Sequence, residues 1–139
     1  MKDEYPVKQV IVIRRDLKMR RGKEIAQGSH ASLAFLTTRL HTVQIDESND
    51  KRPIYGTANI SKAELQWIRD AFTKVCCRVD SEAELDKVYE DAKAAGLEVH
   101  LIEDSGRTEF GGVPTKTCLA IGPDYCDKID KVTGNLELY

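Results

Sequence analysis

A nearly continuous apolar run, rich in β-branched residues, occupies residues 8–13 with the sequence KQVIVI. Runs of this kind are typical of strands that are covered on both faces of a sheet. Covering both faces takes helices above and below the strand. This short segment therefore predicts a layered α/β fold.

A helical pattern follows, from about Lys23 to about Leu40. It is rich in small residues, which let a helix lie close to a sheet or to another backbone. Side chains at three- and four-residue steps mark the stripe that we expect to be buried. This stripe comprises Ile25, Ala26, Ser29, Leu33 and Leu36, and Ala31, Ala34 and Phe35 widen it.

Capping boxes predict the starts of two further helices, because the serine and the glutamate of such a box each accept a free backbone N–H. The pairs are Ser61 with Glu64 and Ser81 with Glu84. Gly96 is expected just after the end of the second helix. The expected apolar stripes are Leu65, Ile68 and Phe72 for the first helix, and Leu85, Val88, Tyr89 and Ala92 for the second.

Three more strands are expected at residues 74–79, 97–102 and 117–121. Parallel strands need helical crossovers, whereas the last two strands follow each other closely enough to pair directly. Pro123 comes next and fits the first position of a final helix.

The fold class that follows is α/β, with one three-layer α/β/α domain over residues 1–139 and a mixed sheet of about four strands. Residues 41–60 contain Pro53 and Gly56 and lack a clear period. We expect them to form an exposed loop.

Charge is distributed unevenly along the chain. The net charge is −2, yet residues 1–39 carry nine basic and four acidic side chains. A basic cluster in an otherwise acidic protein favours an anionic partner, and phosphate is the natural candidate. On charge alone, nucleic-acid or nucleotide binding and an ordinary solvated face remain equally open. The cluster comprises Arg14, Arg15, Lys18, Arg20, Arg21 and Lys23.

The sequence lacks the motifs of several common enzyme and cofactor-binding classes. The chain has no GxGxxG, P-loop, HExxH or GxSxG sequence. Its histidines and cysteines show no metal-ligand spacing, so we expect no metal or other cofactor, and we interpret the four cysteines as buried free thiols. No apolar run reaches the roughly 20 residues of a membrane span, and the N-terminus lacks the apolar core of a signal peptide. We therefore expect a cytoplasmic protein with no membrane contact.

Two polar segments supply candidate functional residues, and the first lies at the junction between the first strand and the first helix. Lys18 and Lys23 lie at this junction, where the N-terminus of the helix also attracts anions. Gln27 lies one turn after Lys23 on the same side of the helix, although an ordinary solvent-facing amide would look the same. His30 has two possible roles. It is either a structural residue, packed or hydrogen-bonded, or it takes part in catalysis.

The second segment follows the strand expected at residues 97–102. Asp104, Arg107 and Thr108 lie on a loop there, where functional side chains often project. A carboxylate can orient or deprotonate a water molecule, and a threonine hydroxyl can hold that water or a substrate oxygen. The alternative is a turn in which Asp104 caps its own backbone.

Three long motifs occur in order along the chain. They are DLKMxxGKxxAQxSHA at residues 16–31, DxGRT at residues 104–108 and AIGPxxxxxIDKVTGxLxLY at residues 120–139. With these motifs the chain resembles the second class of peptidyl-tRNA hydrolase, the type typical of archaea and eukaryotes.

The resemblance implies hydrolysis of the ester that joins a peptide, or an N-blocked amino acid, to the terminal ribose of tRNA. It also implies a compact α/β/α fold, no metal cofactor and, often, a homodimer. The family's functional residues match Lys18, Lys23, Gln27, Asp104 and Thr108, and His30 and Arg107 match motif positions with supporting roles. Arg14, Arg15, Arg20 and Arg21 are expected to contact the tRNA backbone without reading its sequence.

Two positions depart from the family pattern. Glu109 stands where glutamine is usual, and Ser105 stands where alanine is usual. A carboxylate at position 109 is expected to repel phosphate and to raise the pKa of Asp104. The alternative function is therefore a catalytically inactive module on the same fold, which binds RNA or a protein partner.

Overall fold

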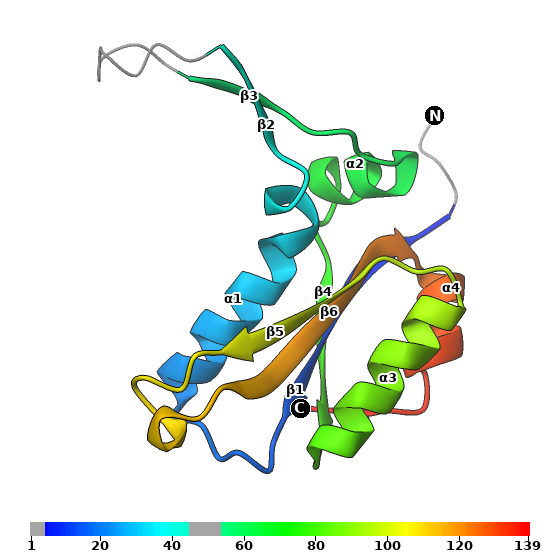
Figure 1. Cartoon of the computed structure of the whole chain (residues 1–139). Helices are drawn as coiled ribbons and strands as arrows, with labels where there is room; N and C mark the ends of the chain where they lie inside the picture. The colour runs from blue at the N-terminus through cyan, green and yellow to red at the C-terminus, as the bar shows by residue number, and fades with distance from the viewer. Residues whose placement is uncertain (1–4, 45–53) are drawn as a thin grey trace.

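The computed structural model describes residues 5–44 and 54–139 and is built around a five-stranded mixed sheet (Figure 1). The strand order is β5-β6-β1-β4-β7. β1 pairs in parallel with β4, and the other neighbouring strands are antiparallel. The strands are β1 (Val7–Arg14), β4 (Lys74–Val79), β5 (Val99–Asp104), β6 (Thr115–Tyr125) and β7 (Glu137–Leu138).

Helices cover both faces of this sheet. α1 and α2 lie on one side, and α3 and α4 lie on the other (Figure 1). The predicted α/β/α layers are confirmed, and β7 adds a fifth strand to the sheet of about four strands that was predicted. The helices are α1 (Arg21–Thr37), α2 (Lys62–Arg69), α3 (Glu82–Ala94) and α4 (Cys126–Thr133).

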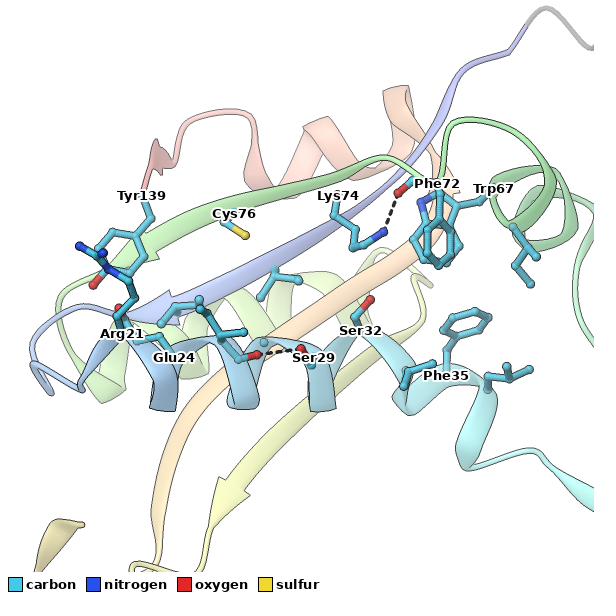
Figure 2. Close-up of a pocket in the computed structure, with 17 residues that line it drawn as sticks. Arg21, Glu24, Ser29, Ser32, Phe35, Trp67, Phe72, Lys74, Cys76 and Tyr139 are labelled. Atoms are coloured by element: carbon cyan, nitrogen blue, oxygen red, sulfur yellow. Dashed lines mark hydrogen bonds between the residues drawn. The ribbon is translucent and has the colours of Figure 1, made fainter. Parts of the chain in front are cut away.

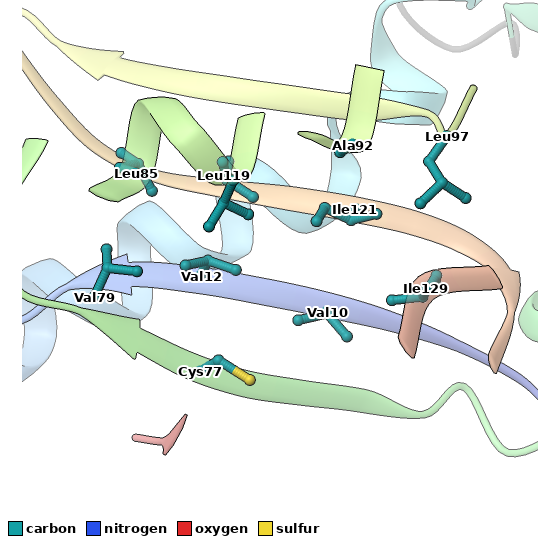
Figure 3. Packing of buried hydrophobic residues seen from close by; sticks show 11 residues of the cluster. Val10, Val12, Cys77, Val79, Leu85, Ala92, Leu97, Leu119, Ile121 and Ile129 are labelled. Carbon is teal, nitrogen blue, oxygen red and sulfur yellow. The ribbon is translucent and has the colours of Figure 1, made fainter. Parts of the chain in front are cut away.

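The apolar run of β1 is buried on both faces because successive strand side chains point in opposite directions. Val10 and Val12 pack toward α3 and α4, together with Leu119 and Ile121 of β6 (Figure 3). Ile11 and its neighbours on the other face pack beneath α1. The predicted stripe of α3 is confirmed, since Leu85, Val88 and Ala92 are buried and Tyr89 packs against them.

Helix α1 buries Ala31, Ala34 and Phe35 as predicted, but other residues of its predicted stripe are exposed. Its buried residues are Gln27, Gly28, Ala31, Ala34 and Phe35. Ile25 and Leu33 are instead 64% and 53% exposed. A buried polar contact helps to set this orientation, because Gln9 of β1 donates to the Ser32 carbonyl at 2.9 Å and accepts from its hydroxyl at 2.5 Å.

The predicted stripe of α2 is also wrong. The capping box of Ser61 and Glu64 is present, yet Ile68 is 39% exposed, and Phe72 lies beyond the end of the helix and is 47% exposed. The buried anchor is Trp67, whose indole N–H donates to the carbonyl of Thr73 at 2.7 Å.

Residues 41–60 contain regular structure that the sequence did not predict. β2 (His41–Gln44) and β3 (Tyr55–Thr57) pair as an antiparallel hairpin that projects from the body (Figure 1). Ile54 and Tyr55 are exposed, as expected for this region. The rest of the predicted loop, residues 45–53, lies outside the described residues.

Three local predictions are corrected. Pro123 does not begin the last helix, because β6 continues to Tyr125 in pairing with β1, and α4 starts at Cys126.

The second capping box forms only in part: Ser81 accepts from the backbone of Glu84, while the Glu84 carboxylate accepts from the backbone of Asp80. Of the cysteines only Cys77 and Cys118 are buried, whereas Cys76 is exposed and Cys126 partly so.

No helix in the described part of the chain has the length and apolarity needed to cross a membrane.

Candidate active site

Residues from the two polar segments meet beside the first turns of α1. Lys23 donates from Nζ to Asp104 Oδ1 at 2.9 Å and to Thr108 Oγ1 at 3.2 Å. Asp104 ends β5, and Thr108 lies on the loop that follows it. The side chains of Lys23 and Asp104 are only 15% and 13% exposed, so this is a sheltered ion pair between segments 81 residues apart.

The Asp104 carboxylate is held by three donors. Besides Lys23, the amide of Gln27 donates to Oδ1 at 3.4 Å, and the backbone N–H of Gly106 donates to Oδ2 at 2.9 Å. The hydrogen bond from Lys23, followed by that from Gly106, lowers the pKa of Asp104 from its ordinary value. The predicted self-capping turn and the predicted polar cluster are therefore both present at this one carboxylate.

Gly106 lets the loop close on itself. Its φ is +81°, and a Cβ there would lie 2.2 Å from the carbonyl oxygen of Val113. Only glycine fits such an approach in the left-handed region. The N–H of Gly112 completes the turn by donating to the carbonyl of Gly106 at 2.9 Å.

Thr117 belongs to the cluster although sequence reasoning missed it. Its hydroxyl donates to Oε1 of Gln27 at 2.5 Å, and both side chains are buried. Strand register explains why: Ile102 pairs with Cys118 and Glu103 pairs with Lys116, so Thr117 is the extra residue of a β-bulge. Bulges re-aim side chains next to functional sites, and simple strand alternation does not reveal them.

The bond from Thr117 fixes the orientation of the Gln27 side chain. Because the amide oxygen is already bonded to Thr117, the amide nitrogen faces Asp104. Gln27 therefore presents N–H donors, and no acceptor, to the cluster.

The structure does not bring the other candidates into this cluster. Lys18 is exposed and has a positive φ of 51°, in the turn before α1. His30 is exposed on α1, so it is not a core residue. Arg107 is exposed on the loop between Asp104 and Thr108.

The four arginines have different surroundings. Arg14 is bonded to Asp16 at 2.7 Å and to the carbonyl of Lys116 at 3.1 Å, and its side chain is only 11% exposed. Arg15 pairs with Asp80 at 2.8 Å. Arg20 pairs with Glu109 and is 82% exposed, while Arg21 lies on the other side of α1. Of these four arginines, Arg20 is the one that contacts the loop carrying Thr108.

Glu109 does not act on Asp104 as the sequence suggested. Its carboxylate is paired with Arg20 at 2.8 Å, and the pKa of Asp104 is lowered rather than raised. The expected upward shift of the Asp104 pKa is therefore wrong, because the hydrogen bond from Lys23 is the largest influence on that carboxylate. Within the described residues, no group of three or more histidine, cysteine, aspartate or glutamate side chains is arranged to hold a metal ion.

Known proteins are similar to this chain over nearly its whole length. The chain is 39% identical over 133 residues to a peptidyl-tRNA hydrolase of Methanocaldococcus jannaschii, with 95% of this chain and 99% of the relative covered. It is 39% identical to one of Methanopyrus kandleri, with 94% and 97% covered, and 37% identical to one of Methanothermobacter thermautotrophicus, with 95% and 99% covered.

A solved structure of a protein of unknown function from Agrobacterium tumefaciens has a similar fold. The TM-score is 0.52 at 12% identity, with 96% of this chain and 97% of the other covered. The family model described as "Peptidyl-tRNA hydrolase PTH2" matches residues 7–139, which include every residue of the cluster. The chain therefore belongs to the PTH2 family of peptidyl-tRNA hydrolases.

Proposed function

We propose that this protein hydrolyses the ester between a peptide, or an N-blocked amino acid, and the terminal ribose of tRNA, and so releases free tRNA for translation. The observation that carries the proposal is the sheltered contact of Lys23 with both Asp104 and Thr108. Ester hydrolysis needs a positioned water, an acceptor that takes the water's proton and returns it to the leaving ribose oxygen, and a stabilised oxyanion. The cluster offers a group for each need.

The lowered pKa of Asp104 bears on its role. A carboxylate that binds its proton weakly is ionised at neutral pH, and it is a poor proton acceptor compared with one whose pKa lies near 7. We assign Asp104 to orienting the attacking water. Proton abstraction by Asp104 becomes easier when substrate draws Lys23 away, because that contact is the main cause of the low pKa.

Lys23 and Gln27 are assigned to the developing oxyanion. Both point donors toward one place, and both are held there by contacts within the chain. Prealigned donors of this kind are worth about 10²–10³ in rate each. Thr108 accepts from Lys23 through its oxygen, so its own hydrogen remains available to bond a substrate oxygen or the water.

We assign the exposed cations around the cluster to tRNA phosphates. Arg20 and Lys18 precede α1, and Arg107 lies on the loop opposite. Arg15 and Arg21 are more distant candidates. Arg14 is already saturated by partners in the chain, so it supports the turn rather than contacting phosphate. His30 is assigned a supporting role, because it lies one turn beyond Gln27 on α1.

We further propose that the reaction needs no metal, that the protein works in the cytoplasm as a single domain over residues 1–139, and that it forms a homodimer. The metal-independence follows from the cluster's chemistry, because its ammonium and amide donors supply the positive charge that a metal would otherwise provide.

Release of tRNA from purified N-blocked aminoacyl-tRNA in the presence of EDTA tests the proposed function. Wild type should release tRNA, and the Asp104→Asn variant should not. Failure of wild type to release tRNA, with tRNA still bound, would favour the RNA-binding module. Release that stops on adding EDTA and resumes with a divalent metal would overturn metal-independence alone.

A further inference from the structure

Arg14 is the most enclosed of the four arginines around the turn before α1. Its side chain is only 11% exposed, whereas that of Arg20 is 82% exposed. Arg21 lines a groove on the other side of α1, near Tyr139 (Figure 2). A guanidinium is costly to remove from water unless its N–H groups find partners within the protein. The partners of Arg14 therefore indicate what this side chain does.

The guanidinium of Arg14 joins the turn before α1 to strand β6. Its Nε and Nη2 donate to the two oxygens of Asp16, at 3.2 and 2.7 Å, so this carboxylate fixes the plane of the guanidinium. Its Nη1 donates to the carbonyl oxygen of Lys116 at 3.1 Å. That carbonyl belongs to the peptide group that links Lys116 to Thr117. Arg14 thus holds the backbone immediately before the residue that orients Gln27.

The backbone at Thr117 departs from ordinary strand geometry. Side chains alternate along a strand, so Thr117 would share the face of Leu119 and Ile121, which pack toward α3 and α4 (Figure 3). Its hydroxyl instead contacts Gln27 of α1, on the other face of the sheet. The β-bulge in the pairing of β5 with β6 makes this possible. Because a bulge disrupts the hydrogen bonds of the strand ladder, a side-chain donor to its backbone stabilises the altered course.

We propose that Arg14 is a positioning residue for hydrolysis, and that it acts through the Lys116 carbonyl and the Thr117 hydroxyl on the side-chain amide of Gln27. This proposal rests on the hydrolase function proposed above. Arg14 bonds to neither Gln27 nor Asp104. It keeps the bulge in the conformation in which Thr117 occupies the amide oxygen of Gln27, so that the amide nitrogen faces Asp104.

The same contacts argue against a direct contact between Arg14 and tRNA. An arginine that binds phosphate presents free N–H groups at the surface. Nε and both Nη atoms of Arg14 already donate within the chain, and little of the side chain is exposed. The affinity for tRNA should therefore not depend on Arg14, and this separates the two roles in an experiment.

Steady-state kinetics of Arg14→Lys with an N-blocked aminoacyl-tRNA tests the positioning role. Lysine keeps the charge but cannot bridge Asp16 and the Lys116 carbonyl with a planar fork. We expect kcat to fall roughly ten-fold with KM nearly unchanged, which is less than the 10²–10³ cost of deleting an oxyanion donor. An unchanged kcat would overturn the proposal.

Arg78→Lys is the matched control for these measurements. Arg78 is also enclosed, with a side chain 19% exposed, and it is paired with a carboxylate outside the cluster, Asp80, at 3.0 Å. This variant should keep the wild-type kcat. An equal fall in kcat for Arg78→Lys and Arg14→Lys would mean that any enclosed arginine has this effect, and the proposal would fail.

Arg14→Met separates positioning from phosphate binding because it removes the charge. Binding of labelled deacylated tRNA should keep its wild-type dependence on salt, whereas the loss of one phosphate contact would lower the slope by about one. A lower slope would overturn the positioning role. Circular dichroism shows whether the variant folds. If it does not fold, Arg14→Lys still separates the roles, because lysine would preserve a phosphate contact and, with it, the wild-type kcat.

A double variant tests the route through Thr117. If Arg14 acts through this residue, Arg14→Lys combined with Thr117→Val should be about as slow as Thr117→Val alone, because the second change removes what the first one positions. Losses that multiply in full would show that Arg14 acts by another route and would overturn the proposed one.

The side-chain amide of Gln27 gives a readout that needs no turnover. In nitrogen-15 NMR spectra its N–H signals should shift in Arg14→Lys as they do in Thr117→Val, and they should stay in place in Arg78→Lys. Wild-type signals in Arg14→Lys would overturn the link between Arg14 and Gln27. Shifted signals in a protein that releases no tRNA would leave this link standing while the proposed hydrolase function fails.

Discussion

The guanidinium of Arg20 donates from Nε and Nη2 to a single carboxylate oxygen of Glu109, at 2.9 and 2.8 Å. This ion pair joins the turn before α1 to the loop that carries Thr108. Arg20 is 82% exposed, so a tRNA phosphate can compete with Glu109 for it. The Glu109 carboxylate, which departs from the family pattern, thus occupies a cation that we assign to tRNA phosphate.

Glu109→Gln should therefore strengthen tRNA binding. Exposed ion pairs contribute about 0–1 kcal/mol, so the expected gain in affinity is up to about five-fold, with kcat nearly unchanged. Fluorescence anisotropy with labelled tRNA at several salt concentrations would measure it. An unchanged or weaker affinity would show that Arg20 does not face the tRNA.

Replacing the cations should have the opposite effect. Arg20→Ala with Arg21→Ala should weaken tRNA binding and flatten its dependence on salt, because each lost phosphate contact lowers the slope by about one. Arg20→Ala alone should account for most of the loss in tRNA affinity, since Arg21 lies on the other side of α1 from the loop of Thr108. Equal slopes for wild type and the double variant would remove both arginines from the tRNA surface.

Asp104→Asn should abolish turnover while leaving tRNA binding largely intact. The substitution keeps the shape of the side chain and removes the charge that orients water and attracts Lys23. The expected loss in kcat is about 10²–10⁴-fold. Single-turnover release of tRNA, measured beside binding of deacylated tRNA, separates the two effects. Near-normal turnover would contradict the role of Asp104.

Thr117→Val should lower kcat with little change in KM, because it frees the Gln27 amide to rotate without removing any group that contacts substrate. A loss of roughly ten-fold is expected, below the 10²–10³ that deleting a whole donor costs. Thr117→Ser keeps the hydroxyl and should restore most of the rate. Equal activity of the two variants would mean that Thr117 only fills space.

The pH dependence follows from the direction of the Asp104 shift. A carboxyl whose pKa is lowered in the folded state stabilises the fold above its unfolded pKa of about 3.9, and this stabilisation is lost as the pH falls through the lower folded value. Asp104 should therefore stay ionised to a lower pH than an ordinary aspartate does. Lys23→Met should raise its pKa, because Lys23 is the main cause of the shift. Carbon-13 NMR titration of the Asp104 carboxyl would measure both, and a wild-type value above 3.9 would contradict the assignment.

The sequence predicted the layers well because apolar periodicity reports burial directly. The continuous run of β1 and the stripe of α3 lie where the pattern placed them. The α2 stripe and part of the α1 stripe were predicted wrongly, because periodicity shows that a face is apolar but not whether another element of the chain covers it. The hairpin of β2 and β3 was not predicted because its strands are short and their sequences show no clear apolar period.

The residues of the candidate site could be predicted where a sequence motif contains them. They could not be predicted where backbone geometry determines which side chains meet. Lys23, Gln27, Asp104 and Thr108 were all candidates before their contacts were known. Thr117 was not, because its access to Gln27 depends on a bulge in the pairing of β5 with β6. The pairing of Glu109 with Arg20 was equally hidden, since no local pattern relates side chains 89 residues apart.

The position of β1 between β4 and β6 has a consequence for synthesis. Its two hydrogen-bonding edges are completed by segments that begin about 60 and 100 residues later in the chain. A growing chain that has made β1 and α1 holds Lys23 and Gln27 but lacks Asp104, and one that has reached Asp104 still lacks the bulge that orients Gln27. The proposed catalytic cluster is therefore complete only late in translation, when β6 enters the sheet.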